Sequence, residues 1–361
     1  MKRNPALDGI RAFAILAVIA FHLRLPGFAA GQIGVNVFFV LSGFLITSIL
    51  LREVDSTGAV RLRRFFARRA LRLLPALFTM IAVVVVYTLA VRPAATHAPL
   101  LRAVPWVVFY AGNWERIAHG TDSLGWFGHT WSLSIEEQFY LLWPLVLIAL
   151  AKWRGVRAVF IGAAVGSAAS LAIRATLWHG HGQYVRIYNG TDTVADQLLI
   201  GCILACAFAL KPQALHAASR MLVWPAIVVL IIMEIFQGPD GLRYTAGYTL
   251  IALAGAIVIG RVVTEPHSNI TRVLAWRPLA TIGLISYGLY IWHLPILLGV
   301  EGHIQSKAVL TIVVLALSFT AAGVSWRLVE APALRLKRRF ESSHALPVAE
   351  TATPSVIMAD T

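Results

Sequence analysis

The stretch LDGIRAFAILAVIAFHL, residues 7–23, is long and apolar enough to form a membrane helix, yet it carries three polar side chains. Asp8, Arg11 and His22 would each be costly in hydrocarbon unless they faced protein or water. At 100° per residue, Arg11 and His22 lie on nearly the same side of a helix, about 16 Å apart along its axis. Asp8 lies three residues before Arg11, on that side. The stretch therefore predicts a membrane helix with one polar stripe facing the interior of a bundle.

The rest of the chain repeats this apolar pattern, since 58% of its 361 residues are hydrophobic and only 13% are charged. Stretches of spanning length lie at 6–23, 33–51, 74–91, 131–150, 156–177, 193–210, 221–237, 244–260, 279–299 and 307–326. They predict an all-α polytopic membrane helix bundle of about ten transmembrane helices. A basic start before an apolar run is also typical of a secretory signal peptide, but Asp8, Arg11 and nine later spans favour a retained first helix.

The net charge of +14 follows from topology. With a cytoplasmic N-terminus, 22 of the 31 Lys and Arg residues lie on the cytoplasmic side and 8 on the outer side. The positive-inside rule selects this orientation, so both termini are predicted to be cytoplasmic and no nucleic acid partner is implied. The two cysteines, Cys202 and Cys206, lie one helical turn apart in an apolar run, which predicts core filling rather than a disulfide or a metal site.

The second span contains small residues, among them Gly34, Ser42 and Gly43, which are typical of close helix packing. The next segment, RLRRFFARRALRLLP at 61–75, has arginines at helical spacing. It predicts an amphipathic helix on the cytoplasmic surface, ending where Pro75 opens the third span. Two interpretations stay open for it: contact with anionic lipid, or bidentate binding of a nucleotide's phosphates.

Later polar residues fall near the outer side. Glu136 and Glu137 begin the fourth span within HTWSLSIEEQFYLLWP, and because neighbours point about 100° apart, we expect one to be hydrated and the other to face the bundle. Asp196 lies in the outer third of the sixth span and His293 in the outer half of the ninth, where a packing role for His293 is an alternative. Arg174 lies close to a span end, from which it can reach lipid headgroups.

The resulting gradient of polar groups suits transfer of an acyl group across a membrane. Arginines at the cytoplasmic face would hold a nucleotide-borne thioester, and a hydroxyl would attack it near the outer side. Histidine removes the hydroxyl proton near neutral pH, and a carboxylate orients the imidazole. The developing oxyanion needs hydrogen-bond donors, for which Ser42, Ser286 and Tyr287 are candidates.

Six motifs carry a resemblance to a known family: LDGIRAFAILAVIAFH, GVNVFFVLSGFLI, FFARRALRLLP, HTWSLSIEEQFYLLWP, ISYGLYIWH and the ending VEAP. In order and spacing they resemble the acyltransferase family 3 membrane proteins, which include lipopolysaccharide and peptidoglycan O-acetylases. The resemblance implies a multi-pass enzyme of the bacterial inner membrane. It would use acetyl-CoA or another acyl-CoA, with no metal, to acylate a hydroxyl of a cell-surface carbohydrate or a small molecule.

The resemblance also assigns residues by motif position. It implies catalytic roles for His22 and Glu136, and acyl-CoA binding by four arginines: Arg11, Arg68, Arg69 and Arg72. The remaining candidates for contact with substrate or oxyanion are Asp8, Ser42, Asp196, Ser286, Tyr287 and His293.

The membrane domain is predicted over residues 1–335, followed by a basic, then disordered, cytoplasmic tail at 336–361. Some relatives carry an additional span and a fused extracytoplasmic esterase-like domain. Without these, we expect this chain to transfer the acyl group directly or to pass it to a separate extracytoplasmic protein. A transporter or proton-coupled flippase is the competing class, because intramembrane acidic and basic groups also form proton relays. The lack of an internal repeat weighs against it. A non-catalytic scaffold would tolerate any single polar replacement in the spans.

Overall fold

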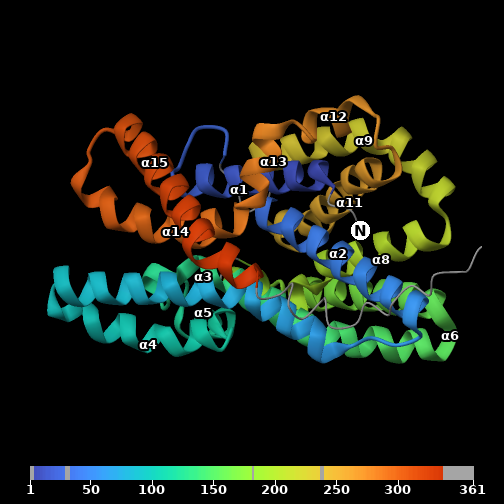
Figure 1. Ribbon diagram of the computed structural model, residues 1–361, viewed down its shortest axis with the longest axis horizontal. Helices are drawn as coiled ribbons and strands as arrows, with labels where there is room; N and C mark the ends of the chain where they lie inside the picture. The colour runs from blue at the N-terminus through green and yellow to red at the C-terminus, as the bar shows by residue number, and fades with distance from the viewer. Residues whose placement is uncertain (1–3, 29–32, 181–182, 236–239, 336–361) are drawn as a thin grey trace, which may run out of the picture.

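The computed structural model describes residues 4–28, 33–180, 183–235 and 240–335, and within these ranges the chain is helical and has no strand (Figure 1). The tail predicted at 336–361 lies outside the described residues. The longer helices are α1 (Pro5–His22), α2 (Ile33–Thr57), α3 (Leu62–Val91), α4 (His97–Val108), α6 (Trp131–Leu177), α8 (Thr191–Leu210), α9 (Pro212–Ile235), α11 (Tyr248–Thr264), α14 (Ser286–Val300) and α15 (Lys307–Ser325).

Short helices connect these elements. They are η1 (Ala94–Thr96), α5 (Gly112–His119), η2 (Gly125–Thr130), α7 (Tyr184–Asn189), α10 (Asp240–Leu242), η4 (Arg243–Gly247), α12 (Asn269–Leu274), α13 (Arg277–Leu284), η5 (Glu301–His303) and η6 (Trp326–Glu330).

Among the described residues, eight helical segments are long and apolar enough to cross a membrane, and the pair α13 and α14, bent by 67°, makes nine. The segment Gly125–Leu177 counts once, although its backbone leaves helical geometry at Arg154 and Gly155. Gly155 has a φ of 67°, which glycine adopts without a steric penalty. The break separates the stretches predicted at 131–150 and 156–177, so each of the ten predicted spans coincides with helix over nearly all of its described residues. The polytopic helix bundle is confirmed.

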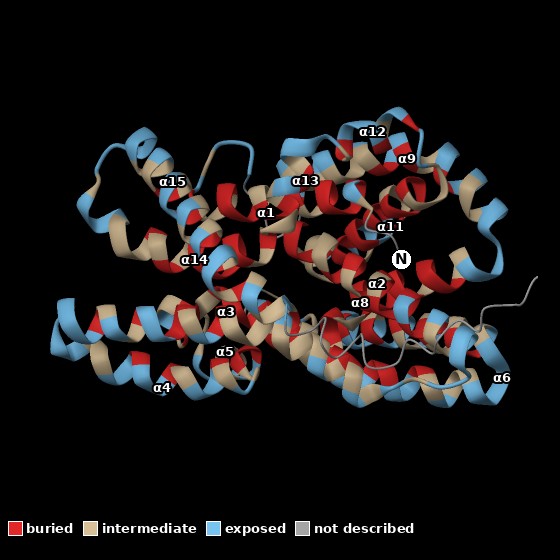
Figure 2. Cartoon of the chain, in the orientation of Figure 1, coloured by how far each residue is buried: buried red, intermediate tan, exposed pale blue. Residues whose placement is uncertain are grey.

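The centre of the bundle is formed by α1, α2, α8 and α11, which are the most buried elements in Figure 2. A Cβ atom on Gly43 would collide with the carbonyl of Leu198, and one on Gly201 with the carbonyl of Val40. Helices α2 and α8 therefore pack backbone against backbone, which confirms the close packing predicted for the second span. Cys202 and Cys206 are buried and free, as predicted.

Two sequence predictions about arginines are wrong. The arginine-rich stretch and the third span form one helix, α3, which passes through Pro75 without a break; Thr79 donates a hydrogen bond to the Pro75 carbonyl at 2.8 Å. Proline is tolerated inside membrane helices because neighbouring groups satisfy the freed backbone. Arg174 does not reach toward headgroups, because its side chain is fully buried in an ion pair with Asp196.

Candidate active site

Helix α1 borders two cavities with its two ends. His22 lines a cavity of about 800 Å³, called the His22 cavity below. Asp8 and Arg11 line a second cavity of about 330 Å³, called the Arg69 cavity. Val35 of α2 and Tyr290 of α14 line both, so the two cavities adjoin at these side chains. The polar stripe predicted for the first span therefore faces the interior, as expected.

The Arg69 cavity is built around one guanidinium and two carboxylates. Arg69 Nε lies 2.9 Å from both carboxylate oxygens of Glu137, and Arg69 Nη2 contacts Glu137 and lies 3.5 Å from Glu136 Oε1. The ring of Tyr140 lies under the guanidinium, with its centroid 3.2 Å from Arg69 Cζ. Both glutamates therefore line an interior cavity and share one arginine, whereas only one of them was expected to face the bundle, and they line a different cavity from His22. One arginine of α3 spans both glutamates of α6, because α3 continues into the bundle.

The other charged residues of this cavity differ in how they are paired. Arg11 donates to Asp8 at 3.1 Å, across one turn of α1. Arg72 lines the cavity and makes no hydrogen bond or ion pair with any described residue. Arg68, which was predicted to bind the donor, lines neither cavity. Of the three motif arginines predicted to bind the donor, Arg69 and Arg72 therefore line the Arg69 cavity and Arg68 does not.

The predicted oxyanion donors also lie in the Arg69 cavity, away from His22. Ser42 donates its hydroxyl proton to Glu136 at 2.5 Å, and Tyr287 donates to the Leu73 carbonyl at 2.9 Å. The hydroxyl protons of Ser42 and Tyr287 are therefore already engaged, while Ser286 lines the cavity and makes no hydrogen bond among the described residues. Asp196 lines neither cavity and is fully buried, so its predicted contact with substrate is wrong.

His22 and His293 meet at the wall of the His22 cavity. His22 Nδ1 lies 2.9 Å from the Val18 carbonyl and 3.4 Å from His293 Nε2, and His293 Nδ1 lies 2.6 Å from the Tyr290 carbonyl. Because carbonyl oxygens only accept, both Nδ1 atoms carry the ring proton. His22 Nε2 is then the unprotonated nitrogen. His293 is 1% exposed and lines neither cavity, so it touches His22 rather than a substrate.

Sequence reasoning gave no role to His129, which completes this group. Its Nε2 donates to the Ile291 carbonyl at 3.2 Å, and its ring centroid lies 5.4 Å from that of His293. Its carbonyl accepts a hydrogen bond of 2.7 Å from the Tyr290 hydroxyl, which also lies 2.6 Å from Ser132 Oγ. His129 is the first residue of the motif HTWSLSIEEQFYLLWP, and this position was its signal in the sequence.

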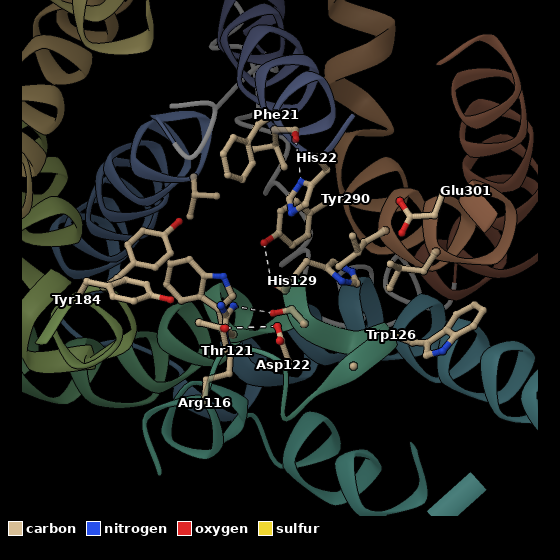
Figure 3. A pocket seen from close by; sticks show the side chains of 18 of the residues that line it. Phe21, His22, Arg116, Thr121, Asp122, Trp126, His129, Tyr184, Tyr290 and Glu301 are labelled. Atoms are coloured by element: carbon tan, nitrogen blue, oxygen red, sulfur yellow. Dashed lines mark hydrogen bonds between the residues drawn. The ribbon is translucent and has the colours of Figure 1, made fainter. Parts of the chain in front are cut away.

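Away from His22, the His22 cavity is aromatic and cationic (Figure 3). Arg116 of α5 donates to the Gly128 carbonyl at 2.9 Å and lies 5.7 Å from the Trp131 ring centroid. Burial lowers the pKa of the Arg116 guanidinium, and the phenols of Tyr188 and Tyr290 oppose that shift. The rings and guanidiniums of the wall come from Phe21, Arg92, Arg116, Trp126, Trp131, Tyr184, Tyr188, Arg243, Tyr244 and Tyr290.

Comparison with known proteins identifies the family. A family model described as an acyltransferase domain matches residues 4–328, nearly the whole chain. The chain belongs to the acyltransferase 3 family. The match includes both cavities and every helix that lines them, from α1 to α14. No solved structure gives a significant match.

Three curated relatives of this family share about a third of their aligned residues with the chain. The peptidoglycan O-acetyltransferase OatA of Listeria monocytogenes is 34% identical over 348 residues, covering 92% of this chain and 56% of the relative. The O-acetyltransferase OatA of Staphylococcus aureus is 35% identical over 358 residues, with 95% and 59% covered. The putative peptidoglycan O-acetyltransferase YrhL of Bacillus subtilis is 35% identical over 342 residues, with 87% and 53% covered. The chain thus spans somewhat more than half the length of these relatives.

Proposed function

We propose that this chain is a membrane O-acyltransferase that moves an acyl group, an acetyl group in the simplest case, from acyl-CoA to a glycan hydroxyl. The donor would enter the Arg69 cavity, the acceptor would occupy the His22 cavity, and His22 would be the general base. One observation carries the proposal: α1 places Arg11 in one cavity and His22 in the other, and the cavities adjoin at Val35 and Tyr290.

The charge distribution of the Arg69 cavity supports a phosphate-bearing donor. Arg69 is already neutralised by Glu136 and Glu137, and Arg11 by Asp8. Arg72 lines the cavity and makes no hydrogen bond or ion pair among the described residues, although Glu136 and Glu330 act on its charge, so it is the group suited to a phosphate. A cavity of 330 Å³ suits a narrow pantetheine arm, with the nucleotide at its entrance. The arm would carry the thioester about 16 Å along α1, from Arg11 to His22.

The hydrogen bonds of His22 support its role as base. Its Nδ1 proton is directed at the Val18 carbonyl and at His293 Nε2, which fixes the ring and leaves Nε2 free to accept a proton. His293 would be a positioning residue, because its own Nδ1 proton is held by the Tyr290 carbonyl and its Nε2 faces His22.

The reaction then balances without any other reagent. The acceptor oxygen forms a bond to the thioester carbonyl carbon while its proton passes to His22 Nε2. The carbon–sulfur bond breaks as the intermediate collapses, and the departing sulfur takes the proton from the imidazolium. The products are an ester of the acceptor and a free thiol. Since two of the relatives are named for peptidoglycan, we take a cell-wall glycan as the acceptor class.

Transfer by the purified full chain in lipid nanodiscs tests the proposal. Radiolabelled acetyl-CoA and peptidoglycan fragments are supplied, and product is followed by label and by mass. His22→Gln should lower the rate by about 10²–10⁴-fold, the contribution of a positioned general base. His119→Gln is the matched control, because the His119 side chain is 65% exposed and lines neither cavity. Undiminished transfer by well-folded His22→Gln protein would reject the base. Transfer from another acetyl donor without release of coenzyme A would reject the donor.

A further inference from the structure

The His22 cavity holds the guanidinium groups of Arg116 and Arg243, which form no ion pair with a carboxylate among the described residues. Arg116 uses one N–H on the Gly128 carbonyl, and its Nε is buried without a hydrogen-bond partner among the described residues. Arg243 lies 5.5 Å from the Tyr244 ring centroid and makes no ion pair or hydrogen bond within the described ranges. A guanidinium is always charged, and removing it from water is costly unless it is paired.

Acidic residues near this cavity do not provide the missing partner. Asp122 and Glu301 line the cavity and are exposed to solvent; Asp122 acts electrostatically on Arg116, but neither carboxylate forms an ion pair with an arginine of the described residues. Glu234 is within electrostatic reach of Arg243 yet beyond ion-pair distance. By contrast, every carboxylate of the Arg69 cavity lies within 3.5 Å of an arginine nitrogen. The carboxylates of the Arg69 cavity are therefore paired with arginines, whereas Arg116 and Arg243 of the His22 cavity are not paired with carboxylates.

Arg116 and Arg243 converge on the same end of the cavity, although they lie far apart in the sequence. Arg243 lies 5.5 Å from the Tyr244 ring centroid, and the Tyr244 ring lies 6.2 Å from the ring of Tyr184. Both guanidiniums also oppose the rise that burial causes in the pKa of the Tyr188 phenol. Tyr184 lies at this end with Arg116, whereas Trp126 and Glu301 lie at the other, with His22 and Tyr290 between (Figure 3). The aromatic rings offer apolar faces for the C–H face of a sugar.

We propose that the His22 cavity selects an acceptor bearing an anionic group, a carboxylate or a phosphate, and that Arg116 and Arg243 bind that anion while the hydroxyl to be acylated lies at His22. The inference rests on the proposed function for the meaning of the bound ligand, but it concerns recognition and not the chemical step. Arginine suits both anions because its planar N–H groups bind two oxygens at once. Both residues would determine acceptor specificity.

Equilibrium binding to the full chain in nanodiscs tests this with four probes that share one scaffold. They are a neutral disaccharide of N-acetylglucosamine, the same disaccharide with a lactic acid ether, the amide of that acid, and the disaccharide 1-phosphate. The first and third probes are neutral, so charge is separated from shape. We expect the wild-type protein to bind the acid or the phosphate at least about tenfold more tightly than the neutral probes, the effect of one charge-assisted contact. The probe that binds more tightly shows whether the acidic group of the acceptor is a carboxylate or a phosphate.

Arg116→Gln and Arg243→Gln should each remove most of this preference, while affinity for the neutral disaccharide stays as in wild type and shows that the cavity is intact. Arg102→Gln is the control, since Arg102 is exposed on α4 and lines neither cavity. Equal binding of charged and neutral probes, or a preference that survives both substitutions, overturns the inference and leaves acyl transfer untouched. If the charge preference depends on Arg116 but no acyl group is ever transferred, the proposed function fails and the inference stands.

Discussion

The arginine–carboxylate clusters at Arg174 and at Arg69 both lie inside this bundle, and they differ in what surrounds them. Arg174 of α6 donates to both oxygens of Asp196 at 2.9 Å, and its other N–H groups reach the carbonyls of Thr193 and Thr245 and the hydroxyl of Thr249. All five N–H donors are used, and both charged side chains are 0% exposed. This cluster is sealed and joins α6, α8 and α11.

The Arg69 cluster is left open. The side chains of Arg69, Glu136 and Glu137 are 18–20% exposed and line a cavity, and Arg69 Nη1 has no partner among the described residues. A saturated cluster has no N–H donor left for a ligand, whereas an unsaturated cluster beside a cavity can bind or orient another group. Burial and charge alone do not distinguish the two clusters. The number of arginine N–H groups that have a hydrogen-bond acceptor does distinguish them.

The largest effect should come from opening the sealed cluster. Asp196→Ala leaves the Arg174 charge buried and unpaired, which costs about 3–5 kcal/mol and should abolish recovery of monodisperse protein or sharply lower its melting temperature. Intrinsic fluorescence during heating in detergent measures this.

Asp192→Ala is the matched control for that change. Asp192 pairs with Arg186 at 2.6 Å, but the two side chains are 38% and 28% exposed, and an exposed pair contributes about 0–1 kcal/mol. The double variant Arg174→Met with Asp196→Leu should recover part of the lost stability, because an apolar pair needs no partner. Similar melting temperatures for Asp196→Ala and Asp192→Ala would refute the sealed-cluster assignment.

Relations within one helix could be predicted from the sequence, and relations between helices could not. Arg11 and His22 share α1, so a rise and a rotation per residue were enough to place both toward the interior. Glu136 was expected near His22 because His22 ends the first span and Glu136 begins the fourth, both at the outer side. The structure instead pairs Glu136 with Arg69. That pairing depends on α3 continuing through Pro75, and on the packing of α3 against α6, which no periodicity encodes.

The same limit explains the misplacement of Arg174 and Asp196. Each residue alone looked like a polar group near a span end, where headgroups or substrate are within reach. Only the packing of α6 against α8 brings them to 2.9 Å. The ten apolar stretches, by contrast, needed no partner to be recognised, because spanning length is a property of each segment.

The second effect in size concerns the open cluster and should leave the fold intact. Arg69→Gln frees Glu136 and Glu137, which can hydrate from the cavity, so the melting temperature should change little. Acyl transfer should fall about 100-fold, the usual result of displacing groups at a site by about an ångström. Arg68→Gln is the neighbouring control, since Arg68 lines neither cavity. An equal loss of transfer in both variants, or a loss of stability as large as in Asp196→Ala, would show that the open cluster is merely structural.

The smallest effects should come from deleting one hydroxyl in each cluster, and they should appear in opposite measurements. Thr249 donates to Asp196 and accepts from Arg174, both at 2.5 Å, so Thr249→Val should cost about 1–3 kcal/mol of stability with little change in transfer per folded molecule.

Ser42 donates to Glu136 at 2.5 Å beside the cavity, where water can replace it, so Ser42→Ala should lower transfer by about threefold to tenfold at nearly unchanged stability. Ser48→Ala on the same helix is the control, because the Ser48 hydroxyl is buried and has no partner among the described residues. Loss of stability without loss of transfer in Ser42→Ala would place Ser42 with the sealed cluster, because a hydroxyl that serves only packing has no means of changing the rate.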